Sequence, residues 1–166
     1  SAAMTEPIIQ FNPYKLKSTA VLDGDTYVLN GRKTMVPLAD EAEVILFYAN
    51  EEGHTQAFLV PTAIDGVTVD RRDKLMGVRS LPTNLVSLTD VRVPVENKLG
   101  GDAGIDFALI LNHSRVALGA AAVGMARAGF EYARDYAKQR VQFGEPIAHR
   151  QSIAFMLADM ATEVDE

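Results

Sequence analysis

Residues 17–33 read KSTAVLDGDTYVLNGRK, and they consist of short β-branched and aromatic runs separated by turn residues. Such runs are typical of β-strands. Asp23-Gly24-Asp25 separates two of the runs, and glycine permits the positive φ that a tight hairpin turn requires. Asn30-Gly31 has the same chemistry and predicts a second turn. The stretch therefore predicts antiparallel β-structure.

Four further apolar runs continue this pattern to about Pro94, at residues 43–49, 55–61, 66–72 and 84–94. Together with the two runs of residues 17–33 they predict at least six strands. That number favours a small barrel or sandwich over a single hairpin.

The period of the apolar residues changes after Leu99-Gly100-Gly101, where they recur at helical spacing. One long helix is predicted from about residue 105 to residue 140. Its middle, ALGAAAVGMARAG at residues 117–129, is rich in small residues, which allow close helix packing in a bundle or at a subunit contact. Gly144 and Pro146 then interrupt the pattern, and a second helix is predicted from about residue 148.

Composition excludes several classes of protein. The 166 residues are 48% hydrophobic and carry a formal charge of −6, which argues against nucleic-acid binding as the main activity. The chain has no cysteine, so disulfides, thiolate metal sites and cysteine nucleophiles are excluded. No membrane span or signal segment is predicted, and no spacing of His, Asp and Glu indicates a metal site. The sequence opens without a helix start and stops inside a helical pattern, so a fragment is expected.

Five motifs resemble the acyl-CoA dehydrogenases in order and spacing. They are TEP at residues 5–7, LDGDTYVLNGRK at 22–33, DKLMGVRS at 73–80, LTDVRVPVENKLG at 88–100 and YAKQRVQFGEPIAHRQSIAFMLADM at 136–160. The family consists of flavoenzymes with an N-terminal helical domain, a middle β-barrel and a C-terminal helical bundle. The resemblance implies an α+β fold, with an antiparallel β-barrel-like middle domain at residues 1–100 and the first, truncated part of the helical bundle at residues 101–166.

The resemblance also implies an FAD site. In relatives the Arg and Phe of R-x-x-F-G reach the FAD of the neighbouring subunit, and TEP lies against the flavin ring. A guanidinium suits a pyrophosphate, an aromatic ring suits a flat nucleotide, and an amide adds hydrogen bonds. The positions assigned to FAD are Met4, Thr5, Met35, Val36, Arg140, Phe143 and Gln151.

The same residues have plainer interpretations when the resemblance is set aside. Arg140 is then an exposed arginine, and Phe143 fills a helix corner. Thr5 is then a helix N-cap, because Glu and Pro follow it.

For the substrate, the resemblance implies contacts from Asn112 and Arg115, where Asn112 replaces the commoner acid. In relatives the catalytic base is a glutamate, carried in most members by late helices that lie outside this sequence. Other members place it just before the arginine, but that position is Ser114 here. No catalytic residue is therefore assigned.

Two positions depart from the family pattern. Phe11 stands where relatives carry a serine, and it cannot donate the hydroxyl hydrogen bond. Pro37 stands where relatives carry threonine or serine against the flavin N5 edge, and proline has neither a hydroxyl nor a backbone N–H.

Two functions are therefore considered. The first is a flavin-dependent acyl-CoA dehydrogenase, which forms a trans-2-enoyl-CoA and passes electrons to an electron-transfer flavoprotein, in the cytoplasm or in a mitochondrial matrix. The second is a non-catalytic subunit that contributes to a partner's FAD site, an alternative that Phe11 and Pro37 favour. A β-barrel binding module without a redox role leaves residues 140–160 unexplained. A homo- or hetero-oligomer is expected, and this stretch alone is expected to be inactive.

Overall fold

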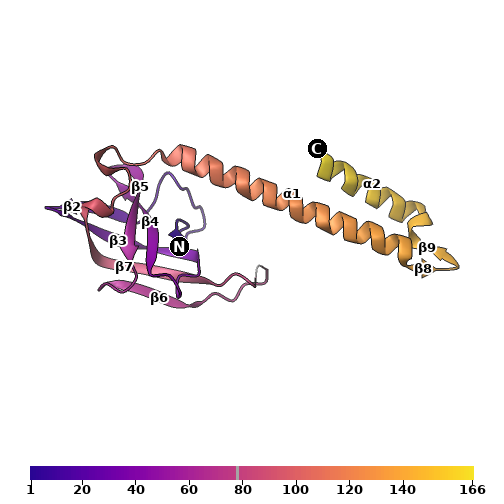
Figure 1. Cartoon of the computed structure of the whole chain (residues 1–166), viewed down its shortest axis with the longest axis horizontal. Helices are drawn as coiled ribbons and strands as arrows, with labels where there is room; N and C mark the ends of the chain where they lie inside the picture. Colours follow the sequence, from indigo (N-terminus) through magenta and orange to yellow (C-terminus); the bar gives the residue numbers. More distant parts are fainter. Residues whose placement is uncertain (78) are drawn as a thin grey trace. The chain divides into compact units, whose positions relative to one another are not determined.

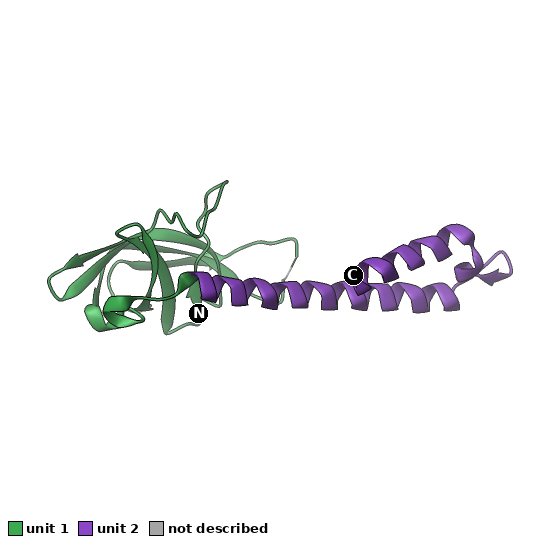
Figure 2. Ribbon diagram, turned by 90° about the horizontal axis from the view of Figure 1, so that it is seen from above, with its two compact units in different colours: residues 1–107 green, residues 108–166 purple. Residues whose placement is uncertain are grey.

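A computed structural model of the chain describes every residue except Val78 and contains two compact units, residues 1–107 and 108–166 (Figure 2). The first unit holds a seven-stranded sheet and the second holds two long helices. The predicted α+β fold class is confirmed.

The hairpin predicted at residues 23–25 is confirmed. Strands β2 (Thr19–Asp23) and β3 (Thr26–Pro37) pair antiparallel from Thr19 opposite Asn30 to Asp23 opposite Thr26. Gly24 in the connecting turn has φ 65°, which glycine adopts without a steric penalty.

The turn predicted at Asn30-Gly31 is wrong, because both residues lie inside β3 at a shift of register against β7. Contacts distant in sequence replace the turn. The Asn30 side chain donates to the Asp90 carboxylate at 3.0 Å and accepts from the Asp90 N–H at 2.8 Å. Gly31 packs directly against Ser18, where a Cβ on Gly31 would lie 2.2 Å from the serine Oγ. The glycine therefore serves a close approach of two segments inside a bulged strand.

The remaining strands are β1 (Ala2–Ala3), β4 (Val44–Glu51), β5 (His54–Pro61), β6 (Val67–Arg72) and β7 (Thr83–Pro94). The order in the sheet is β1-β4-β2-β3-β7-β6, and β5 also pairs with β4. Strands β2 to β7 are labelled in Figure 1. Most pairings are antiparallel as predicted, but β4 pairs in parallel with β1 and with β2, so the sheet is mixed. Among the pairings of the described residues, β5 and β6 do not join, so the sheet does not close into a barrel.

The core of the first unit is a cluster of buried apolar side chains from these strands. Its larger fully buried apolar side chains are Leu29, Val36, Ile45, Phe47, Phe58, Val60, Val86, Val91 and Val93. The aliphatic members are mostly β-branched, and such side chains pack well on a pleated surface.

The first unit extends to Phe107, beyond the domain boundary predicted after residue 100. The Ile105 N–H donates to the Gln56 side chain at 3.0 Å. The Phe107 ring contacts the rings of Tyr14 and Tyr48, with centroids 5.4 and 5.7 Å apart. These contacts attach the connecting segment to the sheet.

In the second unit, helix α1 (Phe107–Gln139) is followed by β8 (Val141–Gln142), β9 (Glu145–Pro146), a short 3-10 turn (Ile147–His149) and helix α2 (Gln151–Asp165). Both predicted helices and the break between them are confirmed. The break is a small hairpin whose turn residues, Phe143 and Gly144, have φ 55° and 84°. Helix α2 runs back along α1 (Figures 1 and 2), and Arg127 lies 3.4 Å from Asp165 across the pair.

Helix α1 is apolar on much of its exposed surface, and Leu118 and Met125 are each 70% exposed. By length and composition α1 could also cross a membrane. That is weak evidence, because core helices of soluble proteins have the same properties. The absence of a membrane span therefore stays a prediction.

Candidate functional site

The segment Met4–Glu6 is fixed to the bulged part of β3. The Thr34 N–H donates to the Thr5 carbonyl at 2.8 Å, and Lys33 Nζ donates to the Met4 carbonyl at 3.1 Å. The register of β3 against β7 shifts between Lys33 and Val36. The fold thus brings two predicted FAD positions, Met4 and Thr5, to the strand that carries a third, Met35. Thr5 does not cap a helix, because no helix begins there.

Lys33 and Glu6 form a buried ion pair beside this segment, which was not predicted from the sequence. Lys33 Nζ lies 3.0 Å from Glu6 Oε1, and the two side chains are 0% and 2% exposed. Glu6 Oε1 also accepts from the Ser18 N–H at 2.8 Å and from the Ser18 hydroxyl at 2.6 Å. Its Oε2 accepts from the Lys17 N–H at 2.8 Å. One carboxylate therefore receives four hydrogen bonds from three backbone or side-chain groups and an ammonium.

Burial and hydrogen bonding shift the pKa of each member of the ion pair in opposite directions. Burial of the Lys33 ammonium lowers its pKa to about 8, although the Glu6 carboxylate raises it. Burial raises the pKa of Glu6, but the hydrogen bonds from Ser18, Lys17 and Lys33 outweigh burial and lower it overall. The pair is charged at neutral pH because each charge meets donors or acceptors of fixed geometry.

Two predicted FAD positions, Met35 and Val36, and the departure at Pro37 follow Lys33 in β3, and their environments differ. Met35 has φ 55° and its side chain is 53% exposed, so it can contact a ligand. The Val36 side chain is 1% exposed in the core, so only its backbone can reach a ligand. The Pro37 carbonyl accepts a hydrogen bond from the Ser1 hydroxyl.

The remaining predicted FAD positions lie in or beside the hairpin between the helices. The Phe143 side chain is 92% exposed, so the alternative in which it fills the helix corner is wrong. The Arg150 guanidinium lies 5.4 Å from the centre of the Phe143 ring and also contacts Glu145 at 3.4 Å. Arg140 is exposed, and among the described residues its guanidinium has no hydrogen bond or ion pair. Gln151 is the exposed first residue of α2.

Arg150 was not predicted as a site residue from the sequence. It precedes the first residue of α2 and donates to the Gln142 carbonyl at 3.3 Å, which ties the hairpin to the helix start. The signal in the sequence was an arginine seven positions after an exposed phenylalanine, and that spacing alone does not predict a stacking contact.

The predicted substrate positions lie on α1. Asn112 and Arg115 are both exposed and are three residues apart, so they share one face of the helix. Ser114 donates its hydroxyl to the Ile110 carbonyl at 3.0 Å. The helix thus presents an amide and a guanidinium together, a pair that can hydrogen-bond a carbonyl, a carboxylate or a phosphate.

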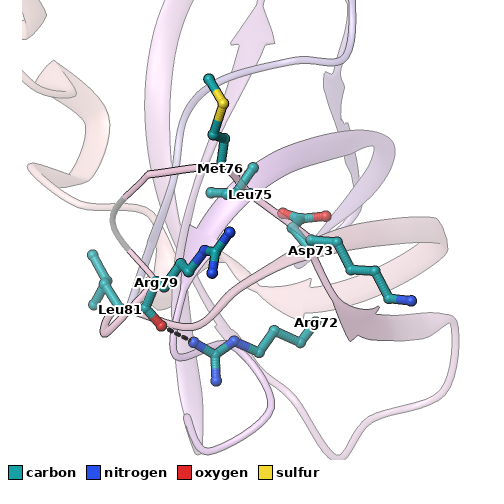
Figure 3. A pocket seen from close by; sticks show the side chains of 7 residues that line it. Arg72, Asp73, Leu75, Met76, Arg79 and Leu81 are labelled. Carbon is teal, nitrogen blue, oxygen red and sulfur yellow. Dashed lines mark hydrogen bonds between the residues drawn. The ribbon is translucent and has the colours of Figure 1, made fainter.

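A cavity of about 670 Å³ lies elsewhere, at the loop that connects β6 to β7 (Figure 3). Its lining is Arg72, Asp73, Lys74, Leu75, Met76, Arg79 and Leu81. Arg72 donates to the Arg79 carbonyl across it. The cavity contains no predicted site residue and belongs to the motif at residues 73–80, of which Val78 lies outside the described residues. In the part of the chain that is described, no group of three His, Asp or Glu could hold a metal ion.

Comparison with known families matches both units. Residues 1–91 match the acyl-CoA dehydrogenase middle domain, and residues 103–166 match the acyl-CoA dehydrogenase C-terminal domain. The two matches follow one another in the order that the motifs predicted.

Individual relatives agree with these matches. The chain is 38% identical over 173 aligned residues to the probable acyl-CoA dehydrogenase YngJ of Bacillus subtilis, covering 99% of this chain and 46% of that protein. It is 38% identical to the caffeyl-CoA reductase-Etf complex subunit CarC of Acetobacterium woodii, covering 98% and 45%. A crystal structure of a glutaryl-CoA dehydrogenase from Mycobacterium smegmatis in complex with FADH2 is 29% identical and superimposes with a TM-score of 0.87, covering 98% and 42%. The chain thus spans less than half the length of these relatives.

Proposed function

Because this chain belongs to the acyl-CoA dehydrogenase family, we propose that the intact protein oxidises an acyl-CoA thioester to the trans-2-enoyl-CoA, as in fatty-acid β-oxidation. The observation that carries the proposal is the contact between the segment of Met4 and Thr5 and strand β3. Two stretches that are distant in sequence, and that the family resemblance assigns to the flavin, are joined there by the 2.8 Å hydrogen bond from Thr34 to Thr5.

The residues present fit an FAD, with two exceptions. Thr5, Arg140 and Gln151 supply a hydroxyl, a guanidinium and an amide, and among the described residues none of these side-chain groups has another partner. This donor set suits the carbonyls and phosphates of a flavin dinucleotide, and the exposed Phe143 ring suits its flat rings. Bound FAD would accept the hydride that leaves the β-carbon of the substrate. The exceptions are Phe11, whose side chain has no donor, and Pro37, which has neither a side-chain donor nor a backbone N–H.

Within this chain, Asn112 and Arg115 would bind and orient the substrate. Arg115 supplies a permanent positive charge, whereas Asn112 supplies a neutral amide. Ser114 has no carboxylate and its hydroxyl is engaged with Ile110, so it cannot act as the general base. We therefore place the base that removes the α-proton outside residues 1–166.

The partners are proposed from the relatives and from the surface of α1. CarC is a subunit of a caffeyl-CoA reductase-Etf complex, which supports an electron-transfer flavoprotein as a redox partner, and we propose that it acts here as the electron acceptor. Helix α1 exposes apolar side chains such as Leu118 and Met125, so the intact protein would cover them with further helices or with a second subunit. A cytoplasmic or mitochondrial-matrix location is part of the same proposal.

A non-catalytic subunit of a hetero-oligomeric dehydrogenase is the second candidate. The observation in its favour is that Phe11 and Pro37 remove two polar contacts from the chain's own side of the site, whereas Arg140 and Phe143 remain exposed. Such a subunit would contribute its hairpin to the FAD of a partner.

Flavin content and turnover of the intact protein decide between the two. We expect stoichiometric FAD in the purified protein and reduction of its absorption bands by an acyl-CoA. Equal FAD content without bleaching by any straight-chain, branched or aromatic acyl-CoA would overturn the dehydrogenase. FAD that appears only after addition of a homologous partner subunit would support the second candidate.

A further inference from the structure

The ion pair between Lys33 and Glu6 fixes three consecutive residues of the chain. Lys33 Nζ bonds to the Met4 carbonyl at 3.1 Å and to the Glu6 carboxylate at 3.0 Å. The next residue, Thr34, donates its N–H to the Thr5 carbonyl between them at 2.8 Å. Two neighbouring residues of β3 therefore fix residues 4, 5 and 6, each through a different group.

The pair is also anchored from a second direction. Glu6 accepts from the backbone N–H groups of Lys17 and Ser18, both at 2.8 Å, and from the Ser18 hydroxyl. Ser18 is 1% exposed, its carbonyl accepts from the Asn50 N–H at 2.8 Å, and Gly31 packs against it. Because Lys17 and Ser18, just before β2, and Lys33 in β3 all bond to Glu6, the segment cannot slide along β3 without breaking buried hydrogen bonds.

Holding two strands together does not require this arrangement. Apolar side chains of similar volume often stabilise a core at least as much as a buried ion pair does, because burial of two charges is costly. What the charged pair adds is direction, since a buried ammonium must find acceptors and takes them here from Met4 and Glu6. The third side of the ammonium faces the Phe47 ring, whose centre is 5.2 Å away.

We propose that Lys33 and Glu6 are positioning residues, which set the backbone of Met4 and Thr5 against the bulge of β3 and thereby fix the surface that receives the flavin ring. The flavin part of this inference rests on the proposed function. The backbone part does not, because it concerns only contacts within residues 1–107. The Thr5 hydroxyl and the Met35 side chain, which the pair does not engage, are the groups left to meet a ligand.

Lys33→Met in the intact protein tests the proposal, with Lys98→Met as the matched control. Lys98 forms an ion pair with Glu51 at 2.8 Å, its side chain is 10% exposed, and it also lies near an aromatic ring, that of Tyr27. The control therefore removes a similar interaction from the same sheet without touching Met4, Thr5 or Glu6.

The first readout is hydrogen exchange at the Thr34 amide, whose bond to Thr5 is the contact in question. We expect exchange to accelerate at least about tenfold in Lys33→Met and to change less than about twofold in Lys98→Met. The second readout is the dissociation constant of FAD together with the shape of the flavin absorption bands. We expect the constant to rise at least about tenfold and the bands to shift only in Lys33→Met.

Equal effects of the two variants on both readouts would overturn the proposal, because the ion pair would then act only on stability. Accelerated exchange at Thr34 with unchanged FAD affinity and spectrum would overturn the flavin part. If the wild-type protein takes up no FAD, the proposed function fails, and the exchange rate still decides the backbone part. Should Lys33→Met fail to fold, the neutral double variant Glu6→Gln/Lys33→Met replaces it in both measurements, with the same expected and contradicting results.

Discussion

Replacing Gly31 by alanine tests whether β3 must approach Ser18 as closely as the structure shows. A Cβ on Gly31 would lie 2.2 Å from Ser18 Oγ, 2.4 Å from Ser18 Cβ and 2.7 Å from Ser18 Cα. Gly31 also has φ 152°, a conformation that residues with a side chain rarely adopt. We therefore expect Gly31→Ala to be strongly destabilising.

The size of the effect follows from how firmly Ser18 is held. The Ser18 hydroxyl donates to Glu6 at 2.6 Å, its N–H donates to Glu6 at 2.8 Å, and its carbonyl accepts from Asn50 at 2.8 Å. Ser18 cannot retreat without breaking these bonds, so overpacking costs about 1–3 kcal/mol. Backbone strain at the positive φ adds about 1–2 kcal/mol. The free energy of unfolding should fall by about 2–5 kcal/mol.

Urea unfolding of the intact protein measures this change, and two other glycines serve as controls. Gly24 also has a positive φ, 65°, but a Cβ there meets no atom within 4 Å, so Gly24→Ala reports backbone strain alone. Gly119 lies in α1 with open space around it, and alanine there should stabilise the helix by up to about 1 kcal/mol. If Gly31→Ala is no more destabilising than Gly24→Ala, the close packing of β3 on Ser18 is refuted.

The other predictions concern the ion pair and the FAD site. Because the pKa of Glu6 is lowered in the folded protein, its contribution to stability is present above pH 4.5 and is lost as the pH falls; urea unfolding should therefore show the gap between wild type and Glu6→Gln shrinking below that pH, and a constant gap would contradict this. The pKa of Lys33, about 8 instead of 10.5, means that the folded protein releases the proton first; the free energy of unfolding of wild type should therefore rise relative to Lys33→Met between these two pH values, and a falling difference would contradict it. Arg140→Gln should weaken FAD binding to the intact protein by about 1.5–3 kcal/mol in calorimetry, whereas Arg134→Gln, which removes a guanidinium already paired with Asp135 at 2.8 Å, should not; equal losses would exclude a specific role. Residues 1–166 alone should remain colourless and inactive after incubation with excess FAD and removal of free cofactor, and a stoichiometric yellow complex would overturn that expectation.

Most of the fold could be predicted from local pattern. The runs at residues 43–49, 55–61, 66–72 and 84–94 all became strands, and the change of period after residue 101 became α1. Asn30-Gly31 shows where local pattern fails, because the same dipeptide chemistry serves a hairpin turn or a bulge. Contacts with Ser18 and Asp90 favour the bulge, and these two residues are distant in sequence and meet the dipeptide only in the folded sheet.

The candidate site was predicted in part. Resemblance assigned Met4, Thr5 and Met35, but Lys33 was treated only as part of a motif. Strict alternation from the inward-facing Tyr27 and Leu29 places Lys33 inward as well, and a lysine at an inward position needs an acidic partner. The sequence could therefore predict that Lys33 is buried and paired with an acidic residue. It could not show which of the acidic residues was the partner, because Glu6 lies 27 positions away.

The two parts of the proposed FAD site differ in how completely this chain determines them. Glu6 and Lys33 fix the segment in the sheet unit with buried hydrogen bonds, so its geometry follows from the chain's own contacts. Phe143 in the hairpin is 92% exposed, has a positive φ, and contacts the Arg150 guanidinium. A phenylalanine held outward costs both backbone strain and apolar exposure, and a group that covers the ring would offset this cost. Arg140 has no partner of its own among the described residues, so a flat and negatively charged group would satisfy both side chains together. Under the proposed function, the sheet unit supplies a surface fixed by buried hydrogen bonds, and the hairpin supplies exposed groups for binding FAD.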